Sequence, residues 1–134
     1  ILTPHLGELE RLIGKCMDTY ERLTKVKELA AYLQSYIIVK GAWTCIVTPE
    51  GNYYFNPTGN PGMATGGSGD VLTGILLGLL AQGYEREDAC RLGVYVHGLA
   101  GNLAAEEKTE IGMTANDIIE SLPKAWKTLT TKNS

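Results

Sequence analysis

The stretch NPGMATGGSGDVLTGILLGLLAQG, residues 60–83, joins a glycine-rich segment to a long apolar one. From Asp70 to Gln82 the apolar run is almost uninterrupted, so it predicts a helix that is apolar on nearly all sides and lies in a core. Gly83 suits the position that follows such a helix. The sequence therefore predicts a glycine-rich loop over 57–69 that leads directly into a buried helix.

The junction between loop and helix has the chemistry of an anion site. Backbone N–H groups are free at a helix N-terminus, and neighbouring glycines let a ligand approach them closely. The positive end of the helix dipole favours phosphate, and it can stabilise charge on a transferring phosphoryl group. Gly67 to Asp70 form a GxGD element, which places a carboxylate in the first helical turn. Such a base can take the proton of a substrate hydroxyl as the hydroxyl attacks a nucleotide phosphate.

Two other phosphate motifs do not match this segment. A Walker loop needs GxxxxGK[ST], and the dinucleotide fingerprint GxGxxG lacks its third glycine after Gly69. A simpler interpretation also stays open, in which the glycines only build a tight turn and Asp70 only caps a helix.

Composition limits the class of protein. The chain has 134 residues, of which 44% are hydrophobic and 20% charged, as in a single globular domain. The net charge of −3 argues against a nucleic-acid partner, which a basic stripe would mark. No apolar run reaches the roughly 18 residues of a membrane-spanning helix. The N-terminal residues ILTPH lack the pattern of a signal peptide.

The cysteines indicate a reducing compartment. Cys16, Cys45 and Cys90 are odd in number and widely spaced. This predicts reduced thiols in a cytoplasmic protein. No zinc site is predicted, since only two histidines accompany the cysteines.

Two helices are predicted near the N-terminus. A strand end over 1–3 is followed by helical apolar spacing over 7–13. Asp18 and Glu21 are spaced as the capping box of a second helix. The apolar stripe of that helix consists of Tyr20, Leu23, Val26, Ala30 and Leu33.

Strands are predicted next. The β-branched run over 36–40 is typical of a strand buried on both faces of a parallel sheet. Residues 43–48 and 53–56 are predicted to pair as a hairpin. The turn over 48–51 joins them, with Pro at its second position and Gly at its fourth.

The remainder of the chain is predicted to be helical. Residues 85–107 continue as a helix after the apolar one. Three glycines share one side of it, as close packing requires: Gly93, Gly98 and Gly101. Thr114, with Asp117 three residues on, opens a last helix that ends near Trp126. The tail over 130–134 is expected to fray.

Other polar and aromatic residues have plain structural interpretations. His97 is interpreted as a satisfied core histidine, and Trp43 and Trp126 as packing residues. Met63 and Asn60 either line a substrate cleft or serve the packing of the loop.

Taken together, five segments resemble the NAD(P)H-hydrate dehydratase family, the kinase-like domain related to YjeF C-terminal regions. The stretch 60–83 closely resembles the family signature. TPHLGE at 3–8 resembles a TPHPGE element, and VKGAWT at 39–44 resembles a KGAxT element. GVYVHGLAGNLAA at 93–105 and MTANDIIESLPKAW at 113–126 match the closing helices of the family.

The resemblance covers essentially the whole chain, in order. Leu6 departs from the pattern, since the family has Pro there. Everything that precedes the TPH element in the family is absent. The chain is therefore expected to form a single domain over 1–134 that corresponds to the C-terminal part of a family domain.

The resemblance implies a fold and a set of site residues. The fold is α/β, a partial ribokinase-like three-layer α/β/α arrangement with a mainly parallel sheet. Asp70 is implied as the catalytic base in contact with substrate, and His5 as a residue near the hydrated nicotinamide. Nucleotide contacts are implied for two segments: Lys40, Gly41, Ala42, Trp43 and Thr44, and Gly66, Gly67, Ser68 and Gly69. Without the resemblance, Lys40 is an exposed strand-end lysine and His5 a loop histidine bonded to backbone.

The implied reaction is the dehydration of NADHX or NADPHX back to NAD(P)H. ADP or ATP is the co-substrate, and Mg²⁺ neutralises its phosphates, although the chain has no dedicated metal cluster. A homo-oligomer is implied, and the chain alone is expected to self-associate and to show little activity. The residues by themselves leave two alternatives open: a ribokinase-like kinase of a vitamin precursor or sugar, and a non-catalytic nucleotide-binding or oligomerisation module.

Overall fold

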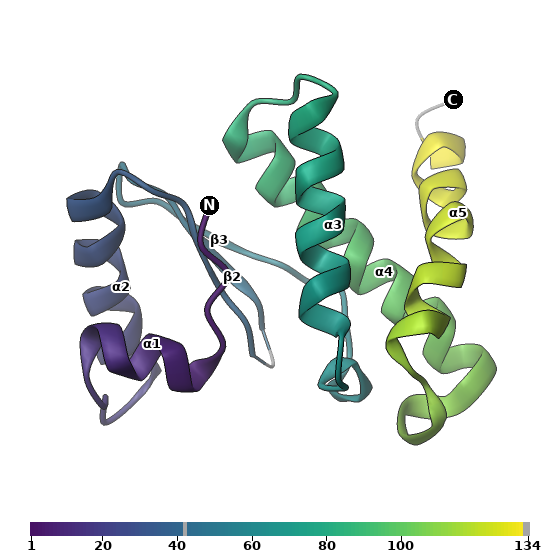
Figure 1. Ribbon diagram of the computed structural model, residues 1–134, viewed down its shortest axis with the longest axis horizontal. Coiled ribbons are helices and arrows are strands. Elements are labelled where there is room, and N and C mark those ends of the chain that lie inside the picture. Colours follow the sequence, from purple (N-terminus) through teal and green to yellow (C-terminus); the bar gives the residue numbers. More distant parts are fainter. Residues whose placement is uncertain (42, 133–134) are drawn as a thin grey trace.

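The computed structural model describes residues 1–41 and 43–132 as a small sheet with helices on both faces (Figure 1). In chain order the elements are α1 (Leu6–Ile13), α2 (Thr19–Leu33), β1 (Ile37–Val39), β2 (Cys45–Val47), β3 (Tyr53–Phe55), the 3₁₀ helix η1 (Pro61–Met63), α3 (Ser68–Ala81), α4 (Arg86–Gly112) and α5 (Ala115–Lys132). Helices α1 and α2 cover one face of the sheet and α3 stands against the other, with α4 and α5 beyond it. Among the described helices, none is long and apolar enough to cross a membrane.

The sheet is antiparallel, which corrects the prediction of a mainly parallel one. The strand order is β1-β2-β3, with Ile38 opposite Ile46 and Ile46 opposite Tyr54. The short connections between these strands permit only antiparallel pairing, because a parallel pair needs a crossover of a dozen or more residues. Such a crossover exists before β1, where α1 and α2 separate Leu2 from Ile37, and these two residues form a parallel bridge.

The strand over 36–40 is buried on both faces, as its sequence predicts. Ile37 and Ile38 point to opposite faces and neither is exposed. Ile37 belongs to a core cluster with α1 and α2: Leu9, Val26, Ala30, Ile37, Cys45 and Val47. Ile38 belongs to a second cluster with α3 and α4: Ile38, Ile46, Leu72, Leu76, Cys90 and Val94. β1 therefore contributes a buried residue to the core on each face of the sheet.

The two N-terminal helices form where predicted, with differences in detail. The carboxylate of Asp18 accepts a hydrogen bond from Glu21 N at 2.8 Å and caps α2. Glu21 does not close a capping box with Asp18, since its carboxylate accepts from Met17 N instead. The predicted stripe is buried only at its centre, because Tyr20 and Leu33 lie at the two ends of α2 and are exposed.

Helix α3 is buried on one side only. Leu72, Leu76 and Leu79 face the core, whereas Leu77 is 62% exposed. The helix lies in the core along this side, as predicted, while α4 and the sheet leave the rest of its surface uncovered in the described chain. An apolar face of α3 is left open to solvent.

Glycines bring α4 close to its neighbours, as predicted. A methyl group on Gly93 would lie 2.8 Å from Leu76 Cδ2 of α3, and one on Gly101 would overlap Met63. Met63 thus fills the space that Gly101 leaves, which confirms its packing interpretation. Helix α4 runs to Gly112 with a break at Thr109, whose φ is 66°.

Helix α5 starts as predicted and extends further. Thr114 N donates to Asp117 Oδ2 at 2.8 Å, and Asp117 N donates to Thr114 Oγ1 at 3.3 Å. The helix continues past Trp126 to Lys132. Trp126 packs against the α4–α5 core, as predicted. Trp43 does not pack, since 68% of it is exposed.

Candidate nucleotide site

The N-terminus of α3 has no side-chain cap. The residue before the helix is Gly67, with a left-handed φ of 89° that only glycine adopts without strain, and no side chain bonds to the first-turn amides. Ser68 N donates to Thr65 O at 3.2 Å and Val71 N to Gly67 O at 3.1 Å. The N–H groups of Gly69 and Asp70 follow between these two bonds and have no hydrogen-bond partner in the described part of the chain.

The glycine-rich loop is held in place by α4. Thr58 Oγ1 donates to Tyr95 O at 3.0 Å, and Asn60 Nδ2 donates to Asn102 Oδ1 at 3.0 Å. Asn60 also caps η1 through a bond from Gly62 N at 3.0 Å. These contacts show that Asn60 serves the packing of the loop. They fix the path of the chain from β3 to the start of α3.

His97 adds a third contact between α4 and the loop. Its Nε2 lies 3.0 Å from Ser68 O and 3.3 Å from Ser68 Oγ. Burial lowers the pKa of His97 below its usual 6.5, and the charge of Lys40 acts in the same direction. The predicted satisfied histidine is confirmed, and its partner is the first residue of α3.

Lys40 lies at the same helix end. A methyl group on Gly69 would lie 3.2 Å from Lys40 Nζ, so the ammonium group contacts the glycine loop where the backbone amides are free. Lys40 follows the last residue of β1, and the end of that strand therefore meets the start of α3. A cation and open amides at one point form a site for an anion.

Asp70 is exposed in the first turn of α3. Across residues 1–41 and 43–132, its carboxylate makes no hydrogen bond or ion pair. Asp70 does not cap the helix, so the plain interpretation of this residue as a cap is wrong. The carboxylate lies free at the start of the helix, beside the open amides.

His5 is the N-cap of α1. Its Nδ1 accepts a hydrogen bond from Glu8 N at 3.2 Å, and its Nε2 lies 3.2 Å from Glu8 Oε1. The bond from His5 N is the main cause that lowers the pKa of Glu8, and Lys40 adds to it. His5 is thus the backbone-bonded loop histidine that its sequence context allows, and its ring remains 64% exposed.

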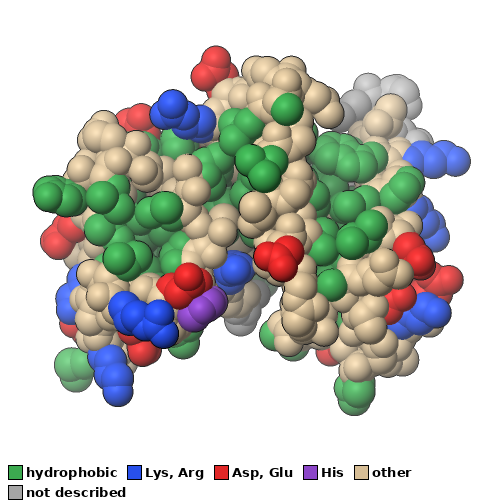
Figure 2. Space-filling view, viewed as in Figure 1, with side chains coloured by type: hydrophobic (Ala, Val, Ile, Leu, Met, Phe, Trp, Pro, Cys, Tyr) green, Lys and Arg blue, Asp and Glu red, His purple; other side chains and the backbone are tan. Residues whose placement is uncertain are grey.

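The described site residues gather at one edge of the molecule. Figure 2 shows a hollow at the lower edge between the α1–α2 part and the α3–α5 part, with acidic, basic and histidine side chains at its rim. The start of α1 and the start of α3 lie at this edge in Figure 1.

The segment after Lys40 is less closely tied to the loop. Gly41 and Trp43 are exposed, and Thr44 accepts a backbone bond from Asn56 N at 2.8 Å. Ala42 lies outside the described residues. The nucleotide contacts predicted for 41–44 therefore stay predictions.

Sequence reasoning missed some residues that build the site. Glu8, Asn102 and Thr58 hold the two loops but lie outside any phosphate motif. Asn102 and Thr58 bond to residues 42 and 37 positions away, so local spacing carries no signal for them. Glu8 bonds to His5 only three positions away, within the TPHLGE element. The glycine stripe of α4 is the one hint, since it marks the side of the helix that faces the loop.

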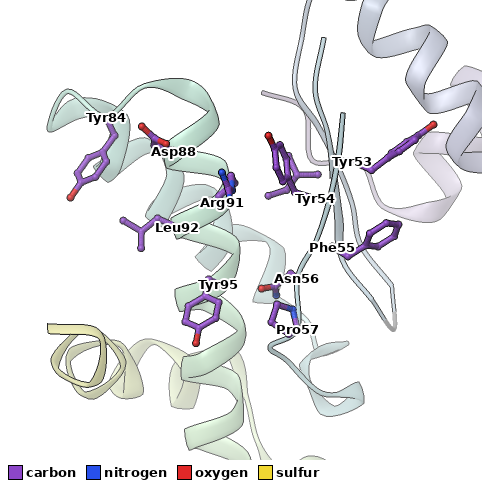
Figure 3. Close-up of a pocket in the computed structure, with 11 residues that line it drawn as sticks. Tyr53, Tyr54, Phe55, Asn56, Pro57, Tyr84, Asp88, Arg91, Leu92 and Tyr95 are labelled. Atoms are coloured by element: carbon purple, nitrogen blue, oxygen red, sulfur yellow. The ribbon is translucent and has the colours of Figure 1, made fainter. Parts of the chain in front are cut away.

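A second hollow of about 620 Å³ lies between β3 and the first half of α4 (Figure 3). Its walls are largely aromatic, with Tyr54, Phe55, Tyr84 and Tyr95 among them. Arg91 lies 4.3 Å above the centre of the Tyr54 ring. None of the predicted site residues lines this groove.

No group of three or more His, Cys, Asp or Glu side chains in the described part of the chain could hold a metal ion. Mg²⁺ is often bound by one or two carboxylates together with substrate phosphates and water, and needs no protein cage. The free carboxylate of Asp70 beside the anion site suits that mode.

The layers of this chain match proteins of the ribokinase-like class. A ribokinase-like superfamily protein of Enterococcus faecalis superposes with a TM-score of 0.76 at 36% identity, over 94% of this chain and 43% of that one. The ADP/ATP-dependent NAD(P)H-hydrate dehydratase of Bacillus subtilis, crystallised with ATP and Mg²⁺, gives a TM-score of 0.85 at 39% identity, over 95% of this chain and 47% of that one. The α/β ribokinase-like fold class is thus confirmed.

The family follows from the sequence match. Residues 1–124 match the family model for NAD(P)H-hydrate dehydratase. The bifunctional NAD(P)H-hydrate repair enzyme Nnr of Thermofilum pendens is 49% identical over 131 residues, which cover 96% of this chain and 25% of that protein. This chain belongs to the NAD(P)H-hydrate dehydratase family. It spans about half the length of the Bacillus subtilis enzyme and a quarter of the Thermofilum one.

Proposed function

We propose that this chain supplies the nucleotide-phosphate site and the catalytic base of an ADP- or ATP-dependent NAD(P)H-hydrate dehydratase. The observation that carries the proposal is the uncapped N-terminus of α3, where free amides, Lys40 and the free carboxylate of Asp70 occur together. Residues 1–134 would form a single unit that corresponds to the C-terminal part of a family domain.

The chemistry divides among these groups. The amides of Gly69 and Asp70, with Lys40, hold the transferring phosphate. Mg²⁺, bound mainly by the nucleotide phosphates, neutralises part of their charge. Asp70 takes the proton of the hydrate hydroxyl as its oxygen attacks the terminal phosphorus, and the nucleotide leaves one phosphate shorter. The ring nitrogen then expels inorganic phosphate by breaking the C–O bond of the new ester, and the resulting iminium loses a proton from the adjacent ring carbon to restore the dihydropyridine.

The hydrated nicotinamide of the substrate is assigned to the loop that carries His5. Helix α1 begins at the same edge of the molecule as α3 (Figure 1). The ring of His5 is exposed, and its Nδ1 is already engaged by the backbone of α1. A ring held in this way has a fixed orientation, which suits contact with the hydrated nicotinamide. The segment 40–44, Ala42 included, is assigned to the adenosine part of the nucleotide.

A chimera tests the proposal. The matching segment of the Bacillus subtilis dehydratase is replaced by these residues, since 95% of the chain superposes on that enzyme. With NADHX and ADP or ATP, we expect the near-ultraviolet absorbance of the reduced nicotinamide to return, and we expect adenine nucleotides to raise the melting temperature more than guanine nucleotides do. The parent enzyme is the positive control.

Two results would contradict the proposal. Phosphorylation of a sugar or vitamin precursor without recovery of the absorbance would instead identify a ribokinase-like kinase. A folded chimera that binds nucleotide without any turnover would identify a binding module.

Self-association is the second part of the proposal. The exposed Leu77 of α3 and Phe55 of the edge strand β3 leave apolar surface and an unpaired strand edge in the described chain. Such surfaces favour association between copies. We expect the 134-residue chain to elute as a homo-oligomer with little dehydratase activity of its own. Size-exclusion chromatography with light scattering measures this, and a clean monomer would refute it.

A further inference from the structure

His97 contacts the start of α3 on the side of the helix that packs against α4. It lies in the middle of α4, and its Nε2 is 3.0 Å from the backbone oxygen of Ser68. Ser68 is the first residue of α3, and only 6% of it is exposed. The contact joins two residues that are 29 positions apart in sequence.

The geometry defines the tautomer of His97. Nε2 also lies 3.3 Å from the hydroxyl of Ser68, which can donate or accept, but its shorter contact, at 3.0 Å, is with the carbonyl oxygen. A carbonyl only accepts hydrogen bonds, so this contact requires the proton on Nε2. Burial and the charge of Lys40 both lower the pKa of the ring, and both therefore favour the neutral form. A neutral ring donates one directed hydrogen bond from Nε2 and leaves Nδ1 without a proton.

The hydrogen bond from His97 affects the Gly69 N–H because a single planar peptide unit links the two groups. The oxygen of Ser68 and the N–H of Gly69 belong to the same trans peptide unit, in which they point in opposite directions. When His97 holds the oxygen, it also fixes the direction of the Gly69 N–H. That N–H is one of the two amides left for a ligand, and Lys40 lies beside it.

We propose that His97 is a positioning residue for the nucleotide-phosphate site, which it serves by orienting the Ser68–Gly69 peptide. The inference rests on the proposed function of that site. The hydrogen bonds with Tyr95 and Asn102 of α4 act further upstream, at Thr58 and Asn60, so they fix the path of the loop but not this peptide. Gly69 itself has no side chain that could orient it.

Three variants of this chain separate positioning from packing. His97→Leu keeps apolar bulk but removes the donor. His97→Gln restores a side-chain N–H donor. Val94→Ala, also on α4, removes bulk from the core cluster of α3 and α4 without touching Ser68. ADP is titrated into each variant, and the Gly69 and Asp70 amide resonances are followed by ¹⁵N NMR in the absence of nucleotide.

We expect His97→Leu to weaken ADP binding roughly 5- to 10-fold, which is the worth of about one hydrogen bond. His97→Gln should stay within about twofold of the parent, in line with a retained donor. Val94→Ala should lower the melting temperature without changing ADP affinity. The Gly69 amide resonance should shift in His97→Leu and return towards its original position in His97→Gln.

Either of two results would overturn the inference. One is a Gly69 amide resonance that does not respond to His97→Leu. The other is a glutamine variant as impaired as the leucine one. Because the amide resonances are read without nucleotide, they support or overturn the role of His97 even if the chimera shows that the proposed function is wrong.

Discussion

Helices α3 and α5 begin in opposite ways. At α5, Thr114 and Asp117 exchange two hydrogen bonds that satisfy free amides of the first turn. At α3, the preceding residue is Gly67, and no side chain bonds to the first turn. Both helices carry an aspartate in that turn, Asp70 in α3 and Asp117 in α5. The two carboxylates differ only in what they contact.

The capped start of α5 stabilises its helix, whereas the uncapped start of α3 leaves polar groups open. A side-chain cap stabilises a helix by about 1 kcal/mol, and α5 has one. Helix α3 forgoes this contribution, and its amides and carboxylate remain available to a ligand. Three hydrogen-bonded contacts from α4 hold this uncapped end in place, as the proposed site requires.

The two aspartates give the largest expected contrast. In the chimera, Asp70→Asn should lower turnover by about 10²–10⁴, the usual contribution of a general base, while nucleotide binding persists. Asp117→Asn makes the same chemical change at the capped helix and should leave turnover nearly unchanged. Steady-state rates with NADHX measure both. Near-normal turnover of Asp70→Asn would show that the free carboxylate is not the base.

Gly67 and Gly83, at the two ends of α3, allow a second comparison, which concerns the backbone. Gly67 and Gly83 have similar left-handed φ values of 89° and 93°, so alanine at either should cost about 1–2 kcal/mol. A methyl group on Gly67 would also lie 3.1 Å from Ala115 Cβ, whereas one on Gly83 meets nothing within 4 Å. Urea unfolding should therefore show a larger loss for Gly67→Ala.

Only the glycine before α3 should affect the ligand. ADP affinity is expected to fall in Gly67→Ala and to stay at the parent value in Gly83→Ala, because Gly83 lies at the far end of the helix. Equal affinities in the two variants would mean that the backbone at the start of α3 does not shape the site.

The smallest expected effect concerns pH. The pKa of His97 is lowered on folding, so the unfolded chain binds more protons as the pH falls below the usual value of 6.5. Stability should therefore be complete above pH 6.5 and decline as the pH falls through the lower folded pKa. Glu8 and Glu21, whose pKa values are lowered from 4.5, act in the same direction at more acidic pH.

His97→Gln removes the titrating group at position 97. The loss of stability between pH 6.5 and the folded pKa of His97 should therefore be smaller in this variant. Melting temperatures between about pH 7 and pH 5 measure it, since that window spans the usual histidine pKa. An unchanged slope in the variant would show that His97 titrates alike in the folded and unfolded chain.

Local patterns predicted the parts of the fold that depend on neighbours in sequence. Caps at Asp18 and Thr114 and the turn at Gly51 follow from side chains a few residues apart. The same patterns erred where burial depends on distant elements. Trp43 was predicted to pack but is exposed.

The sequence by itself determined the family, the glycine loop that leads to Asp70, and a doubly buried β1, because these depend on residue type and short-range spacing. Only the tertiary structure decided that the sheet is antiparallel, that Lys40 meets Gly69, and that His97 holds Ser68. The direction of the strands depends on the length of the connections between them. The two contacts depend on which helices and strands pack against each other. A contact between residues 29 positions apart leaves no periodic trace in the sequence, whereas a hydrogen bond across three residues does.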